Sequence, residues 1–217
     1  LHHLTRRQRQ MCIRDSYETG LIDGVTTNPS LMLKAGKDPR EVLKEISDIF
    51  PFHASVSAEV VGDSVEEMLE MADDYIEIGP NITIKVPLTP EGLKVCKDLS
   101  TDDVAVNVTL CFSTAQAILA AKAGATYVSP FVGRVNDQSF DGIKLIEEIS
   151  DVYATHKQKT QVLAASIRDV HQVASCFRVG ADICTIPSKI FSGMYKHILT
   201  DQGIAKFDED WTKLVGG

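Results

Sequence analysis

A single lysine, Lys85, lies inside the apolar run Ile82-Thr83-Ile84-Lys85-Val86-Pro87. Its β-branched neighbours and the turn residues at 79–81 predict a buried strand. An isolated buried charge is costly, and desolvation lowers the pKa of a lysine toward the neutral amine that attacks carbonyl groups. The alternative is a lysine whose ammonium group reaches solvent from the end of a strand. The run therefore predicts either a Schiff-base nucleophile or a strand-end lysine.

Other polar residues stand where further predicted strands end. They are Asn28, Glu59, Asn107, Thr109, Ser129, Arg134, Ser166 and Arg168. A carboxylate can move protons beside an amine, and guanidinium groups bind phosphate in a bidentate manner. Taken singly, each has an ordinary interpretation: Asn28 begins a turn, Glu59 ends a strand in solvent, and the arginines lie on the surface. Their shared placement at strand ends favours one site that combines an amine nucleophile with groups that bind an anion.

Short apolar segments alternate with helical segments along the chain. Strands are predicted at 24–28, 54–60, 82–86, 105–110, 127–132, 161–165 and 183–186. Most lack two-residue alternation, which is typical of parallel strands covered by helices. The pattern predicts an α/β fold, a (β/α)₈ TIM-type barrel whose first strand is missing or replaced, with a C-terminal helix. A doubly wound open sheet is the alternative, although the chain has no G-x-G-x-x-G or Walker motif.

Capping residues predict where several of the helices begin. Asp38, Ser64, Thr89, Ser113 or Thr114, and Asp169 precede predicted helices, and a further helix is predicted from Ser188 toward Leu199. A tail helix is expected to carry Phe207, Trp211 and Leu214, which would cover the barrel of the same chain or pack on a neighbouring one.

Composition limits the classes of function. The chain has 217 residues and a net charge of −8, which argues against binding to nucleic acid or to anionic membranes. Its apolar runs are too short to span a bilayer. The five cysteines lack metal or redox spacing, and the histidines are scattered, so we expect no metal, no cofactor and a reducing, cytoplasmic compartment.

Residues 1–16 differ from the rest of the chain. This segment, LHHLTRRQRQMCIRDS, is basic and polar and has no strand pattern. We expect a leader foreign to the domain, disordered or derived from cloning sequence; a basic targeting segment is the alternative. Residues 17–217 contain no linker-like stretch and are expected to form one barrel domain.

Four motifs carry a resemblance to a known family: GVTTNPS at 24–30, IKVPLT at 84–89, NVTL at 107–110 and SPFVGR at 129–134. Over about residues 19–211 the chain resembles the transaldolase family, and most of all its short bacterial members, which include fructose-6-phosphate aldolase. The resemblance implies a (β/α)₈ barrel and a metal-free, class I aldol mechanism. It also implies sugar-phosphate substrates of the pentose phosphate pathway and a ring of five subunits or a pair of such rings.

The resemblance implies a role for each matching position. Lys85 would form the Schiff base, and Glu59 and Thr109 would hold the water used in proton transfer. Three polar residues, Asn28, Asn107 and Ser129, would contact the dihydroxyacetone unit. The phosphate would lie on Arg134, Ser166 and Arg168.

Two positions favour transaldolase over its aldolase relatives. This chain resembles transaldolases in having a glutamate at position 59 and a phenylalanine at position 131, Glu59 and Phe131. The aldolase branch prefers glutamine and tyrosine at these positions. A tyrosine hydroxyl can donate a proton and Phe131 cannot, so the difference has chemical content.

The chain departs from the family at the general acid/base, an aspartate on the family's first strand. Asp15 lies in the leader and Asp23 precedes the strand at 24–28, so neither is assigned to this role. From Glu59 and Phe131, the expected function is transaldolase. The alternatives are fructose-6-phosphate aldolase, a sugar-phosphate-binding remnant of low activity, or another Schiff-base barrel such as deoxyribose-phosphate aldolase.

Overall fold

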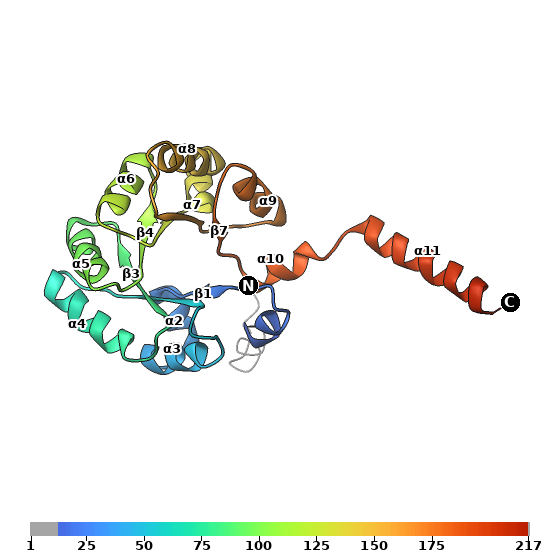
Figure 1. The fold of residues 1–217 in the computed structure, drawn as a ribbon, viewed down its shortest axis with the longest axis horizontal. Coiled ribbons are helices and arrows are strands. Elements are labelled where there is room, and N and C mark those ends of the chain that lie inside the picture. The colour runs from blue at the N-terminus through green and yellow to red at the C-terminus, as the bar shows by residue number, and fades with distance from the viewer. Residues whose placement is uncertain (1–12, 217) are drawn as a thin grey trace.

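The computed structural model describes residues 13–216, and a curved parallel sheet with helices outside it forms the body of the protein (Figure 1). The sheet has seven strands in the order β1-β2-β3-β4-β5-β6-β7, and each strand pairs in parallel with the next. The strands are β1 (Gly24–Thr26), β2 (Ser55–Glu59), β3 (Ile82–Pro87), β4 (Val106–Cys111), β5 (Tyr127–Pro130), β6 (Gln161–Ala164) and β7 (Ile183–Cys184).

This strand order confirms the barrel-type prediction over the doubly wound alternative. A doubly wound sheet reverses its order at a switch point, whereas here the order follows the chain throughout. The described residues include no ladder between β1 and β7, but the curvature of the sheet brings these strands close. The hydroxyl groups of Thr26 and Thr185 lie 2.8 Å apart and link them.

Helices follow the strands and cover the outside of the sheet (Figure 1). The first group comprises α2 (Pro29–Ala35), α3 (Pro39–Ser47), α4 (Val65–Ile76), α5 (Pro90–Thr101) and α6 (Thr114–Lys122). The second comprises α7 (Val132–Asp137), α8 (Gly142–Thr155), α9 (Val170–Arg178), α10 (Ser188–Met194) and α11 (Ile198–Val215).

Local capping chemistry explains most of the helix starts. Asp38, Ser64, Thr89, Ser113 and Asp169 each accept a hydrogen bond from a backbone N–H in the first turn, which confirms these predicted caps.

Four described helices were not predicted from the sequence: α2, α7, α8 and the short helix at residues 13–18. Helix α7 begins at Val132, inside the segment 127–132 that was predicted as a strand. The apolar residues there are buried in a helix as well as they would be in a strand, so periodicity could not separate the two.

Strands β2, β3 and β4 are largely buried on both faces, with apolar residues on one face and polar residues on the other. Val56, Ala58, Ile84, Val86 and Val108 have no exposed surface and form the core between the sheet and its helices. The opposite face carries hydroxyl, amide and charged groups, beginning with Ser55 and Thr83, whose hydroxyls lie 2.8 Å apart. The interior of such barrels is usually filled by branched apolar side chains, whereas here the inner face is polar. The interior is therefore a candidate site.

The C-terminal part departs from the prediction in where its helices begin and end, and it bears on the two alternatives left open for the tail helix. The helix predicted from Ser188 toward Leu199 is broken into α10 and α11, and α11 extends away from the barrel (Figure 1). None of its residues is buried, and Phe207, Trp211 and Leu214 are exposed, so α11 does not cover the barrel of its own chain. No described helix is long and apolar enough to cross a membrane.

The leader predicted at 1–16 lies only partly within the described residues. Residues 1–12 fall outside them, and residues 13–18 are helical. Ile13 of the leader packs against the hydrophobic core, so the described end of the leader lies against the body. Tyr17, the next residue after the leader, contacts the ring of Phe50, with ring centroids 4.7 Å apart.

Candidate active site

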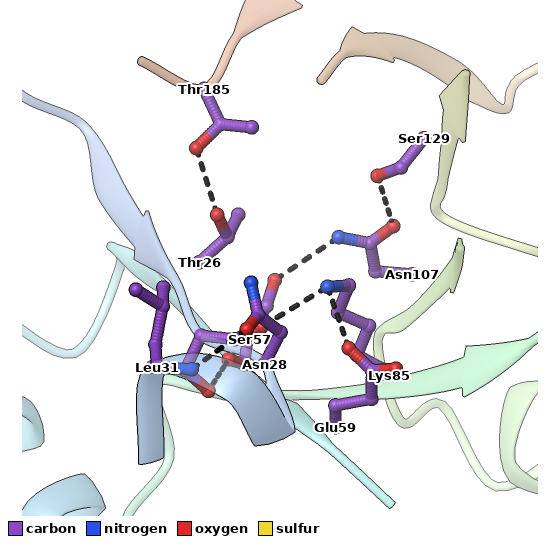
Figure 2. A network of polar contacts seen from close by, with 10 residues as sticks. Thr26, Asn28, Leu31, Ser57, Glu59, Lys85, Asn107, Ser129 and Thr185 are labelled. Carbon is purple, nitrogen blue, oxygen red and sulfur yellow. Dashed lines mark hydrogen bonds and ion pairs between the residues drawn. The ribbon is translucent and has the colours of Figure 1, made fainter. Parts of the chain in front are cut away.

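Lys85 and Glu59 form a buried ion pair inside the sheet (Figure 2). The two residues are register partners in the β2–β3 ladder, so their side chains leave the same face at the same level. Lys85 Nζ lies 2.8 Å from Glu59 Oε2 and donates a second hydrogen bond, at 3.0 Å, to the carbonyl oxygen of Thr27. The Lys85 and Glu59 side chains are 6% and 12% exposed. The lysine is therefore enclosed, as the first of the two sequence interpretations predicts, and does not reach solvent from a strand end.

A second polar chain runs beside this pair from β5 through β4 to β2, passing across β3 (Figure 2). Ser129 donates from its hydroxyl to Asn107 Oδ1 at 2.7 Å, and Asn107 Nδ2 donates to Ser57 Oγ at 3.2 Å. All three residues are buried. Buried polar groups that satisfy one another hold fixed orientations, so this chain presents preset donors and acceptors near the amine.

Thr109 lies on the same face of β4 as Asn107, two residues further along. Its side chain has no exposed surface, and its hydroxyl has no hydrogen-bond partner among the described residues. A buried hydroxyl without a protein partner is the kind of group that a bound water or a substrate oxygen satisfies.

Asn28 follows β1 and caps α2. Its Oδ1 accepts a hydrogen bond from the backbone N–H of Leu31 at 2.9 Å. The cap explains why the Asn28-Pro29 pair begins a helix here and not a turn alone. With one oxygen held in this way, the side chain lies between β1 and Lys85 (Figure 2).

Arg134 and Phe131 lie together just after β5. The Arg134 guanidinium carbon stands 5.0 Å from the centre of the Phe131 ring, within the range of a cation–π contact. Phe112 packs against the Phe131 ring, with centroids 5.6 Å apart. The aromatic pair thus supports the guanidinium group from one side.

Ser166 and Arg168 follow β6 and approach the same place from the next strand. Ser166 has a φ of 59°, in the left-handed region, and its carbonyl accepts from Gly133 N at 3.1 Å. The Arg168 guanidinium donates to Asp137 Oδ2 at 2.7 Å. Arg134 and Arg168 both line one cavity of about 800 Å³, so the structure brings the two predicted guanidinium groups together.

The amine does not line that cavity. A second cavity, of about 410 Å³, is lined by Thr27, Asn28 and Glu59 together with apolar residues of α2, α3 and α4. Glu59 of the ion pair therefore lines one cavity, and Arg134 and Arg168 line another.

The described residues contain no group of three or more His, Cys, Asp or Glu side chains that could hold a metal ion. The groups that do converge are an amine, a carboxylate, an amide and hydroxyls. That set can form and break an imine, because it supplies a nucleophile, a proton acceptor and fixed dipoles.

Sequence reasoning missed two residues that complete these contacts. Ser57 stands two residues before Glu59 on one strand, so the two-residue period of a strand places both on the inner face. Asp137 stands three residues after Arg134, a spacing that would have suggested proximity only if 132–137 had been predicted as a helix.

Comparison with known proteins shows the family of the chain. The sequence model of the family described as Transaldolase/Fructose-6-phosphate aldolase matches residues 8–217. A protein of Paracoccus denitrificans named "Probable transaldolase" is 52% identical over 201 residues, which cover 93% of this chain and 92% of the relative. Proteins with the same name from Cereibacter sphaeroides (strain ATCC 17025 / ATH 2.4.3) and Caulobacter vibrioides are 53% and 48% identical, over 89% and 92% of this chain and 88% and 91% of their own lengths. The chain belongs to the transaldolase/fructose-6-phosphate aldolase family.

Proposed function

We propose that this protein is a transaldolase that transfers a dihydroxyacetone unit between sugar phosphates through an imine on Lys85. The observation that carries the proposal is the enclosed amine of Lys85, 2.8 Å from the Glu59 carboxylate. Membership in the family and the relatives at about half identity support transferase chemistry of the aldolase type.

The first step requires a neutral amine. An ammonium group has no free electron pair, so Lys85 becomes a nucleophile when a proton passes along its contact with Glu59. The amine then attacks the C2 carbonyl of a ketose phosphate, and loss of water from the resulting carbinolamine gives the imine. Thr109 and Glu59 are proposed to hold the water that carries protons in these steps, since the Thr109 hydroxyl is buried and has no described partner.

The second step breaks the C3–C4 bond. The C4 hydroxyl gives its proton to the water proposed to lie on Glu59 and Thr109, and the protonated imine accepts the electron pair of the C3–C4 bond. An aldose phosphate leaves with its new aldehyde at C4, and a three-carbon enamine stays on Lys85. We assign Asn28, Asn107 and Ser129 to the hydroxyl groups of this unit, because fixed donors act most strongly when they need no rearrangement. Addition of the enamine to a second aldose phosphate, followed by hydrolysis, completes a ping-pong cycle.

Substrate phosphate is assigned to the cavity that Arg134 and Arg168 line. Two guanidinium groups give bidentate hydrogen bonds and the positive charge that a phosphate dianion requires. Ser166 is proposed to add a hydroxyl donor, and Phe131 to hold Arg134 in place.

The proposal extends to the pathway, the compartment, the absence of a cofactor and the oligomeric state. The enzyme would act in the pentose phosphate pathway of the cytoplasm, without a metal or other cofactor. It would assemble as a homo-oligomer, a pentamer or decamer by resemblance, in which exposed residues of α11 contact another subunit.

Fructose-6-phosphate aldolase is the second candidate, because the matched family includes that activity. The two differ in the fate of the three-carbon unit, which an aldolase releases as free dihydroxyacetone. Phe131 has no hydroxyl to protonate the enamine, which favours transfer. The acid/base aspartate of the family is not assigned to a described residue: Asp15 lies in helix 13–18 and Asp23 precedes β1. A chain without that group would turn over slowly, since such groups contribute about 10²–10⁴-fold.

Borohydride trapping tests the proposal. Incubation with fructose 6-phosphate and borohydride should attach a three-carbon unit to a peptide containing Lys85, detected by mass spectrometry. Lys85→Met should abolish trapping, whereas the matched control Lys97→Met, at an exposed position of α5, should not. Trapping that persists at another lysine in the Lys85→Met protein would refute the assignment.

A further inference from the structure

Helix α7 carries two residues, Gly133 and Asp137, that bear on Arg168. They stand four positions apart, so they occupy the same face of α7 one turn from each other. Arg168 comes from the loop after β6 and lies along this face. The helix therefore forms one wall against which the guanidinium group rests.

The contact at Gly133 is a close approach. A methyl group at this position would lie 2.6 Å from Arg168 Nε and 2.2 Å from the carbonyl oxygen of Ser166. Only a residue without a side chain leaves space for the arginine stem to lie against the helix. This close approach places Arg168 Nε next to the backbone of α7.

The outer end of the guanidinium group is held by Asp137. A terminal nitrogen of Arg168 donates to Asp137 Oδ2 at 2.7 Å, and the two side chains are each 53% exposed. Without this contact a half-exposed arginine would sample many rotamers, and binding a ligand would then require it to be ordered. Arg134, Asp137 and Arg168 line the same cavity, so the ion pair keeps Arg168 beside Arg134.

We propose that Asp137 is a positioning residue that holds Arg168 toward the phosphate of the substrate and so sets the preference for phosphorylated over unphosphorylated aldehydes. This inference rests on the proposed function, in which Arg134 and Arg168 bind phosphate. Asp137 uses one terminal nitrogen of Arg168, and the other terminal nitrogen stays available for the ligand. Its own negative charge is offset by the guanidinium group that it contacts.

The alternative role for Asp137 is competition with the substrate phosphate for Arg168, and it predicts the opposite change in phosphate binding. If Asp137 only competed with phosphate for Arg168, its removal would strengthen phosphate binding. The Asp137→Asn variant distinguishes the two roles, because asparagine has nearly the same shape and lacks the charge. Asp151→Asn, at an exposed position of α8 that does not line the cavity, is the matched control.

The test compares two acceptors, glyceraldehyde 3-phosphate and glyceraldehyde, in steady-state assays of the full chain. For Asp137→Asn, KM for the phosphorylated acceptor should rise about fivefold, in the range of an exposed ion pair, with kcat unchanged. KM for glyceraldehyde should stay the same, and Asp137→Glu should recover part of the loss. A fall in KM for the phosphorylated acceptor, or equal changes with both acceptors, would overturn the proposal.

Calorimetric titration with inorganic phosphate separates this inference from the function beneath it. Phosphate binding should weaken severalfold in Asp137→Asn, more strongly in Arg168→Ala and not in Asp151→Asn. Weakening in Arg168→Ala alone would reject the role of Asp137 and leave the phosphate site standing. Unchanged binding in both variants would reject the phosphate site itself, whereas borohydride trapping at Lys85 would still report on the chemistry.

Discussion

Lys85 and Glu59 face each other across the β2–β3 ladder as register partners, and their charged atoms meet at 2.8 Å in a buried site. Parallel pairing at equal level gives this contact directly, with no loop involved. A reactive pair built on two strands is held more rigidly than one built on loops, because each strand is fixed by its neighbours.

The pair predicts a strong coupling in stability. Glu59→Leu should destabilise the fold by about 3–5 kcal/mol, because it leaves the Lys85 ammonium buried without a counter-charge. Lys85→Met should have a cost of similar origin, and the double variant should be much more stable than the sum of the two losses predicts. Urea unfolding of the four proteins measures the cycle. Additive losses would show that the two groups do not interact in solution.

The hydroxyl of Ser129 predicts a cost in both stability and activity. Ser129→Ala removes the donor to Asn107 Oδ1 and leaves that oxygen buried and unpaired, which should cost about 1–3 kcal/mol. Because the Asn107 amide then loses its fixed orientation, kcat should fall as well, while trapping at Lys85 persists. Thr212→Ala, on the exposed face of α11, is the control and should change neither quantity. Unchanged stability in Ser129→Ala would indicate that a water replaces the hydroxyl.

Arg134 predicts selectivity for phosphorylated substrates. Arg134→Ala should raise KM for glyceraldehyde 3-phosphate by about ten- to a hundredfold, since hydrogen bonds to charged groups are each worth about 1.5–3 kcal/mol. KM for glyceraldehyde should be nearly unchanged. Arg178→Ala, at an exposed position of α9 away from the cavity, serves as the matched control. An equal loss with both aldehydes would assign Arg134 a structural role.

The buried cysteines predict a loss of stability at alkaline pH. Burial raises the pKa of the Cys96 thiol to about 12 and that of the Cys111 thiol to about 12, from an ordinary value of 9.0. Above pH 9 the unfolded chain releases these protons and the folded chain keeps them, so the stability contribution is complete below pH 9 and is lost as the pH rises toward 12.

Urea unfolding between pH 8 and pH 11 measures this effect. The free energy of unfolding should fall above pH 9 by up to about 1.4 kcal/mol per pH unit for each thiol. Cys96→Ala should show a shallower fall, because one titrating group is gone. The same slope in the variant and the parent would place the titrating groups elsewhere.

Sequence alone determined which residues converge, because each parallel strand is encoded by a local residue pattern and that pattern repeats along the chain. Buried β-branched runs fixed the strands, and the carboxyl ends of parallel strands meet at one mouth, so Glu59, Lys85, Asn107 and Ser129 could be grouped before their distances were known. Caps such as Ser64 and Asp169 fixed helix starts for the same reason, since a side-chain oxygen meets the backbone N–H groups of its own first turn.

The tertiary structure decided what no local pattern contains. The partner of Lys85 depends on the register of β2 against β3. The partner of Arg168 is Asp137, which lies thirty-one residues away on α7. The start of α7 at Val132 and the exposed face of α11 were decided in the same way. These outcomes depend on which surfaces meet after folding. The apolar periodicity of a segment does not show which other element will cover its apolar face.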